Sequence, residues 1–148
     1  MEIQRFNITA RIDYTPESID RFVDLCEQVI LSLTKSRQAR FLLKTAVDEL
    51  TLNAIEHGYG KESGLVTVGM EHCGDAIRFE ISDFGCGIDP SRIHFDRIAR
   101  TEDDLHARGW AFSILDKLTD NISIARNDPQ GARITLMVPL KERGISES

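Results

Sequence analysis

The chain of 148 residues has few of the features that would place it in a membrane, outside the cell or on nucleic acid. No apolar run approaches the roughly 20 residues that a membrane-spanning helix needs, and the first residues, Met1 to Arg5, show no secretory pattern. The three cysteines, Cys26, Cys73 and Cys86, are far apart and have no metal-binding spacing, which favours a reducing cytoplasm. A net charge of −6 argues against general nucleic-acid binding, which requires a basic surface, but is compatible with a basic partner protein.

Two common nucleotide-binding fingerprints are also absent. The chain contains no Gly-x-x-x-x-Gly-Lys-Ser/Thr loop, and no Gly-x-Gly-x-x-Gly opens a β-α-β unit. No internal repeat, low-complexity tract or linker divides the sequence, so one domain over residues 1–148 is expected. The fractions of hydrophobic (41%) and charged (28%) residues are typical of a soluble globular protein.

Hydrophobic periodicity predicts an α+β fold. Alternation over residues 3–12 predicts a strand, and Thr15-Pro16-Glu17 is a helix start with a cap, a proline and an early acid. That helix is expected to end near Leu33, and a second to run from Ser36 to Gly58. The other expected elements are strands at 65–72 and 75–83, a charged irregular segment at 90–107, a helix at 110–118, and strands at 122–125 and 132–140. This order, with hairpins between strands, predicts a two-layer α/β sandwich whose mixed, mainly antiparallel sheet has helices over one face.

The second predicted helix carries a polar row. Glu49, Asn53 and His57 are four residues apart, so they stack along one side of a helix beside its apolar stripe. An amide oxygen can hold Mg²⁺ alongside phosphate oxygens and waters, and a carboxylate one turn earlier can orient a hydroxyl and accept its proton. The alternative is that Glu49 and Asn53 lie on a solvated helix flank, and that His57 only closes the helix.

A second unusual string, Asp83-Phe84-Gly85-Cys86-Gly87-Ile88, follows a predicted strand. Its two glycines allow a tight turn and a close approach of the backbone to a ligand. Asp83 has the parity of the buried residues of that strand, so its carboxylate is expected to point inward, where it could accept a hydrogen bond from the exocyclic amine of adenine. The alternative is a structural glycine turn with a satisfied aspartate. Cys86, inside this turn, is predicted to be a small buried filler in preference to a reactive thiol.

Together the two strings resemble a known family. Glu49-x-x-x-Asn53-Ala54-x-x-His57-Gly58 is similar to the N box of the GHKL ATPase superfamily, and Asp83-x-Gly85-x-Gly87-Ile88 to its first glycine box. Within that superfamily the chain most resembles the bacterial anti-sigma-factor serine kinases, over about residues 5–140. The resemblance implies a Bergerat-type sandwich that binds ATP and Mg²⁺ under a lid formed by residues of about 90–108.

The resemblance also implies a role for each matching residue. Asn53 would hold Mg²⁺, Glu49 would act as general base on a serine hydroxyl, and Asp83 would bind the adenine amine. The further nucleotide contacts it implies are His57, Gly85, Gly87, Ile88, Thr101, Arg108, Gly109 and Ala111. Such kinases bind a sigma factor as homodimers and phosphorylate a small anti-anti-sigma protein on serine, so cytoplasmic partner switching without direct contact to nucleic acid or membrane is expected.

Two motifs depart from the family pattern. The second glycine box, usually Gly-x-Gly, is Gly109-Trp110-Ala111, and the Gly-Thr-Thr near the C-terminus is Gly131-Ala132-Arg133, which lacks the hydroxyls. These departures keep open the reading of a catalytically impaired regulator that acts by partner binding. A third reading is the detached ATPase module of a histidine-kinase-like system, which would need a substrate histidine on a separate protein.

Overall fold

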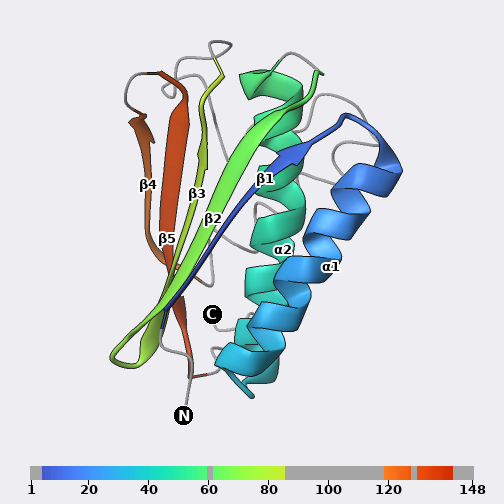
Figure 1. Ribbon diagram of the computed structural model, residues 1–148. Helices are drawn as coiled ribbons and strands as arrows, with labels where there is room; N and C mark the ends of the chain where they lie inside the picture. Colours follow the sequence, from blue (N-terminus) through green and yellow to red (C-terminus); the bar gives the residue numbers. More distant parts are fainter. Residues whose placement is uncertain (1–4, 60–61, 86–118, 128–129, 142–148) are drawn as a thin grey trace, which may run out of the picture.

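The computed structural model describes residues 5–59, 62–85, 119–127 and 130–141, which are arranged in a helical layer and a sheet (Figure 1). The elements in chain order are β1 (Arg5–Ile12), α1 (Pro16–Leu33), α2 (Arg37–Asn53), the π-helical turn η1 (Ala54–Gly58), β2 (Gly64–Cys73), β3 (Ala76–Asp83), β4 (Asp120–Arg126) and β5 (Ala132–Pro139). The five strands and first two helices predicted from the sequence are confirmed. The helix expected at 110–118 lies outside the described residues.

The five strands form one sheet in the order β1-β2-β3-β5-β4. Every pair of neighbouring described strands is antiparallel, which confirms the expected mainly antiparallel sheet. The register between β4 and β5 shifts between Asp120 and Ser123, a bulge at the edge of the sheet. Helices α1 and α2 cover one face (Figure 1), so the architecture is the predicted two-layer sandwich of the Bergerat type.

Both long helices begin at side-chain caps. The hydroxyl of Thr15 accepts a hydrogen bond from the Ser18 N–H at 3.1 Å, with Pro16 at the first helical position. The hydroxyl of Ser36 accepts one from the Ala39 N–H, also at 3.1 Å. These caps satisfy backbone N–H groups that the helix itself leaves unbonded, so they set where each helix starts.

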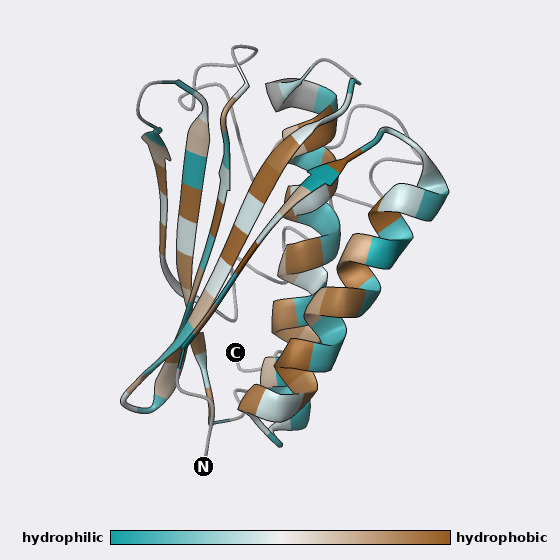
Figure 2. Cartoon of the chain, viewed as in Figure 1, coloured by the Kyte–Doolittle hydropathy of each residue, from teal (hydrophilic) through white to brown (hydrophobic). Residues whose placement is uncertain are grey.

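The hydrophobic core lies between the helices and the sheet. Alternate residues of the central strands are buried, and the alternation is visible as hydrophobic and hydrophilic bands along β2 and β5 (Figure 2). Helix α1 contributes Cys26, whose burial raises the pKa of its thiol to about 12, so this cysteine is an inert filler. The strand residues in this core are Ile12, Val66, Val68, Met70, Ile77, Phe79, Ile81, Ile134, Leu136 and Val138.

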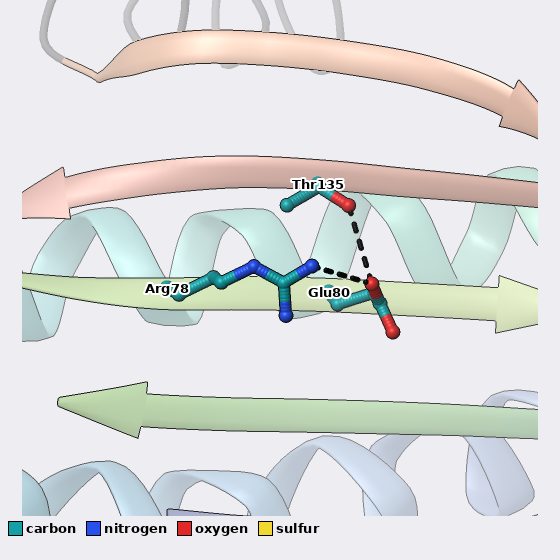
Figure 3. A network of polar contacts seen from close by, with 3 residues as sticks. All are labelled: Arg78, Glu80 and Thr135. Carbon is teal, nitrogen blue, oxygen red and sulfur yellow. Dashed lines mark hydrogen bonds and ion pairs between the residues drawn. The ribbon is translucent and has the colours of Figure 1, made fainter. Parts of the chain in front are cut away.

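The opposite face of the sheet is polar. Arg78 forms an ion pair with Glu80 at 3.1 Å, and the Thr135 hydroxyl donates to the same carboxylate at 3.4 Å (Figure 3). Solvent-exposed pairs of this kind contribute at most about 1 kcal/mol to the free energy of unfolding. The stability of the fold therefore comes mainly from the apolar residues on the buried face of the sheet. None of the helices in the described part of the chain combines the length and the apolarity that crossing a membrane requires.

Candidate functional site

Helix α2 places Glu49 and Asn53 one turn apart at the border of the core. Leu50, between them, is 1% exposed, and Asn53 is 4% exposed although it is polar. Glu49 is half-buried, and its Oε2 atom is buried. Burying an amide and a carboxylate is costly unless they bind something, so this part of the helix is not the solvated flank of the alternative reading.

The helix does not continue as an α-helix to Gly58. Its last turn, η1, is π-helical, and the Tyr59 N–H donates to the carbonyl of Ala54 at 3.1 Å, five residues back. The predicted end at Gly58 is confirmed, but the four-residue step from Asn53 to His57 crosses a wider turn than the α-helical stacking assumes. The side chain of His57 lies outside what the structure describes. Single π turns are frequent at functional sites, because they redirect the residues that follow.

Asp83 ends β3 with its carboxylate turned inward. It pairs with Val66 of β2, and it is 6% exposed, like the apolar residues two and four positions earlier. Its Oδ1 atom accepts hydrogen bonds from the N–H groups of Gly85, at 3.0 Å, and Ala132, at 3.4 Å. The expected inward orientation is confirmed.

The pKa of Asp83 lies above its ordinary value because burial disfavours the charged form, and the two backbone N–H donors lower it in part. Between described residues, both hydrogen bonds to the carboxylate end on Oδ1. A carboxylate held in this way can use Oδ2 to accept a hydrogen bond from an amine of a ligand.

The backbone around Asp83 is held by side chains from distant parts of the chain. The amide of Asn127 donates to the Asp83 carbonyl at 2.9 Å, and the amide of Gln130 donates to the Phe84 carbonyl at 3.0 Å. The Phe84 N–H donates to the hydroxyl of Tyr59 at 2.8 Å. Sequence reasoning missed Asn127 and Gln130, since their only signal was a turn composition that any hairpin would share.

The two motifs meet at one end of the sandwich. Both α2 and η1 pack against β3, and Tyr59 directly after η1 contacts Phe84 directly after Asp83. Among the described residues there is no group of three or more His, Cys, Asp or Glu side chains that could hold a metal ion. Magnesium bound with a nucleotide does not need such a cage, because phosphate oxygens and waters complete its coordination.

Gly131 packs against the Asp83 turn so closely that no side chain fits. A Cβ atom there would overlap the Asp83 carbonyl and lie 2.8 Å from the Phe84 Cα, and its φ of +107° is unfavourable for other residues. The next residue, Ala132, keeps an N–H bond to Asp83 although it lacks the hydroxyl of the family motif. Arg133 is exposed on the opposite side of β5, away from Asp83.

We expect Gly131→Ala to lower the free energy of unfolding by more than about 2 kcal/mol, since it combines backbone strain with overlap. Gly74→Ala is the matched control, because Gly74 also has a positive φ (+65°) but open space around it. That control should cost about 1 kcal/mol. Urea unfolding of both variants gives the comparison, and equal losses would contradict close packing at Gly131.

Several residues predicted for the site lie outside the described part of the chain. They are the glycine-box residues Gly87 and Ile88 and the lid and second glycine-box residues Thr101, Arg108, Gly109 and Ala111. Their roles stay predictions. The structure places Glu49 and Asn53 on α2, which packs against β3, and joins Asp83 to Gly85 by a hydrogen bond at the end of β3.

Comparison with known proteins agrees with this geometry. Residues 8–138 match the model of the histidine kinase-like ATPase domain. The chain is 30% identical over 95 residues to the anti-sigma F factor of Clostridium botulinum strain Alaska E43, covering 64% of this chain and 66% of that protein, just under two thirds of its length. It is 30% identical over 100 residues to the anti-sigma F factor of Clostridium novyi, covering 67% and 70%, and 27% identical over 120 residues to that of Clostridium perfringens strain 13, covering 80% and 81%.

An ATPase domain implies ATP binding. The residues present suit a nucleotide, because Asn53 offers a buried amide to a metal–phosphate group and Asp83 offers a buried carboxylate to an amine. Because the match spans most of the sequence, the chain belongs to the histidine kinase-like ATPase domain family of the GHKL superfamily.

Proposed function

We propose that this protein is an ATP-dependent serine/threonine-protein kinase that acts as an anti-sigma factor. It sequesters a sigma factor and phosphorylates an anti-anti-sigma protein on serine. The observation that carries the proposal is that α2, which carries Glu49 and Asn53, and η1, which follows it, pack against β3, which ends in the inward carboxylate of Asp83, within an ATPase-family fold. The name anti-sigma F factor, which the similar clostridial proteins carry, supports the choice of partner.

Asp83 and Asn53 bind the two ends of the nucleotide in this proposal. Asp83 accepts a hydrogen bond from the exocyclic amine of adenine, while its Oδ1 stays bonded to the Gly85 and Ala132 N–H groups. Asn53 offers its amide oxygen to Mg²⁺, which when bound neutralises charge on the phosphates. Gly85 leaves room for the base beside the turn.

Glu49 is the general base. Its carboxylate accepts the proton of the substrate serine hydroxyl as the serine oxygen bonds to the γ-phosphorus and the bond to the β-phosphate oxygen breaks. The products are phosphoserine and ADP. Positioning and charge neutralisation supply most of the acceleration in such transfers, so the burial of Asn53 and of Glu49 Oε2 suits the task.

The same proposal describes how the sigma factor and the antagonist exchange on the kinase. A homodimer of the kinase holds the sigma factor in the cytoplasm until an unphosphorylated antagonist binds the kinase and frees it. Phosphorylation of the antagonist returns the sigma factor to the kinase. The net charge of −6 is compatible with a basic surface on one of these partners.

A second candidate is a partner-binding regulator with weak or no nucleotide turnover. The motif departures Gly109-Trp110-Ala111 and Gly131-Ala132-Arg133 favour it. Against it, the Ala132 N–H still reaches Asp83, so the adenine end of the site does not depend on the missing hydroxyl.

Calorimetric titration of MgATP, followed by incubation with γ-labelled ATP and a candidate antagonist, distinguishes these functions. We expect saturable binding and an acid-stable phosphoprotein, because phosphoserine survives acid. Binding without transfer would favour the regulator, whereas an acid-labile phosphoprotein would favour the histidine-kinase-like module. A folded protein that does not bind MgATP would exclude both ATP-dependent readings.

A further inference from the structure

One hydroxyl joins three segments beside the candidate adenine site. The Tyr59 hydroxyl donates to the Leu65 carbonyl at 2.5 Å and accepts from the Phe84 N–H at 2.8 Å. The backbone N–H of Tyr59 donates to Ala54 at the start of the π turn, at 3.1 Å. Tyr59 therefore connects the residue after Asn53 with the residue after Asp83, which lie in different motifs and on different elements.

The Tyr59 ring occupies space that is open only because Gly64 has no side chain. A Cβ atom on Gly64, the first residue of β2, would overlap three carbons of this ring. The ring thus packs directly on the β2 backbone, and its hydroxyl reaches the carbonyl of Leu65 in β2 and the N–H of Phe84 directly after β3. Few rotamers of a tyrosine satisfy both contacts, so the ring is held in one place.

The hydroxyl also keeps its proton. Burial raises the pKa of Tyr59, and the nearby Asp83 carboxylate raises it too, while the Phe84 and Leu65 backbone bonds lower it in part. Only the neutral hydroxyl can donate to one backbone group and accept from another at the same time. Both bonds are therefore present throughout the neutral pH range.

We propose that Tyr59 is a positioning residue, which holds the Asp83–Phe84 backbone so that the Asp83 carboxylate meets the exocyclic amine of the base. The inference rests on the proposed ATP binding and deepens it. Tyr59 acts on the Phe84 side of this backbone, while Asn127 and Gln130 bind the two carbonyls. Because η1 leads directly into Tyr59, the same residue sets the adenine end of the site relative to Asn53.

The test compares two nucleotides in the full chain. ATP carries the exocyclic amine, and purine riboside triphosphate lacks it, so the ratio of their dissociation constants measures the contact with Asp83. In Tyr59→Phe we expect the ATP affinity to fall about 3- to 10-fold, as for one lost hydrogen bond, with little change for the analogue. The Phe84 amide should also exchange hydrogen faster in the nucleotide-free variant.

Tyr14→Phe is the matched control. Its hydroxyl donates to Glu56 at 3.2 Å and its side chain is 40% exposed, so removing it should leave both affinities unchanged. Gly64→Ala is a second test variant, which displaces the Tyr59 ring and keeps the hydroxyl. It should lower the preference for ATP in the same direction as Tyr59→Phe.

Each other outcome has a distinct meaning. Equal loss of affinity for both nucleotides in Tyr59→Phe, or loss of the folded state, would overturn the positioning role in favour of a structural one. An unchanged ratio in Tyr59→Phe would overturn it as well. A wild type that binds the analogue as tightly as ATP would remove the amine contact itself, and a wild type that binds neither would overturn the proposed function together with this role.

Discussion

Replacing Glu49 by glutamine is expected to lower the rate of phosphoryl transfer by about 10²- to 10⁴-fold while ATP binding stays within a few-fold of wild type. Glutamine keeps the size of the side chain and its place one turn before Asn53, but its amide cannot accept the serine proton. Single-turnover assays with labelled ATP and the antagonist separate this chemical step from binding.

Asp48→Asn is the matched control for that experiment. Asp48 is the neighbouring carboxylate on α2 but is exposed, so its neutralisation removes one charge without touching the site. Transfer in Asp48→Asn should equal that of wild type. If Glu49→Gln retained full transfer, Glu49 would have no role as general base.

Asp83→Asn is expected to lower the affinity for ATP about 10- to 100-fold, since a hydrogen bond to a buried charge is replaced by a contact between two donors. Asparagine keeps an Oδ1 acceptor for the Gly85 and Ala132 N–H groups, so the turn itself should survive. Calorimetric titration of MgATP measures the loss. Asp75→Asn, at an exposed position in the β2–β3 turn, is the control that should bind normally.

The same substitution should not destabilise the nucleotide-free protein at neutral pH. Burial raises the folded-state pKa of Asp83, so the folded protein binds a proton at this site more tightly than the unfolded chain does. The resulting stability is fully present below the unfolded pKa and is lost as the pH rises through the folded pKa. At neutral pH the charged carboxylate therefore weakens the fold, and asparagine removes that cost.

The melting temperature of Asp83→Asn should consequently exceed that of wild type by more at pH 7.5 than at pH 4.5. Thermal unfolding at both pH values, without nucleotide, provides the measurement. If Asp83→Asn instead melted below wild type at pH 7.5 and approached it at pH 4.5, the charged carboxylate would stabilise the fold, contrary to the direction of its pKa. Opposite effects on binding and stability are typical of groups kept for function.

Much of the fold was predictable from local sequence because its signals are local. The caps at Thr15 and Ser36 and the alternation along β2, β3 and β5 depend on neighbours within a few residues. The inward carboxylate of Asp83 followed from parity along a single strand. The π turn was not predictable in this way, since one extra residue in a helical turn leaves the hydrophobic pattern before it unchanged.

The sequence by itself determined the sheet-forming segments, the two long helices and the polar row that includes Glu49 and Asn53. Only the tertiary structure decided what surrounds Asp83. Tyr59 comes from the end of a helix, and Asn127 and Gln130 come from the turn before β5, which pairs with the distant strand β3 as well as with its sequence neighbour β4. Such contacts depend on the register and order of paired strands, and these are set by the packing of the whole core, which no local pattern of residues encodes.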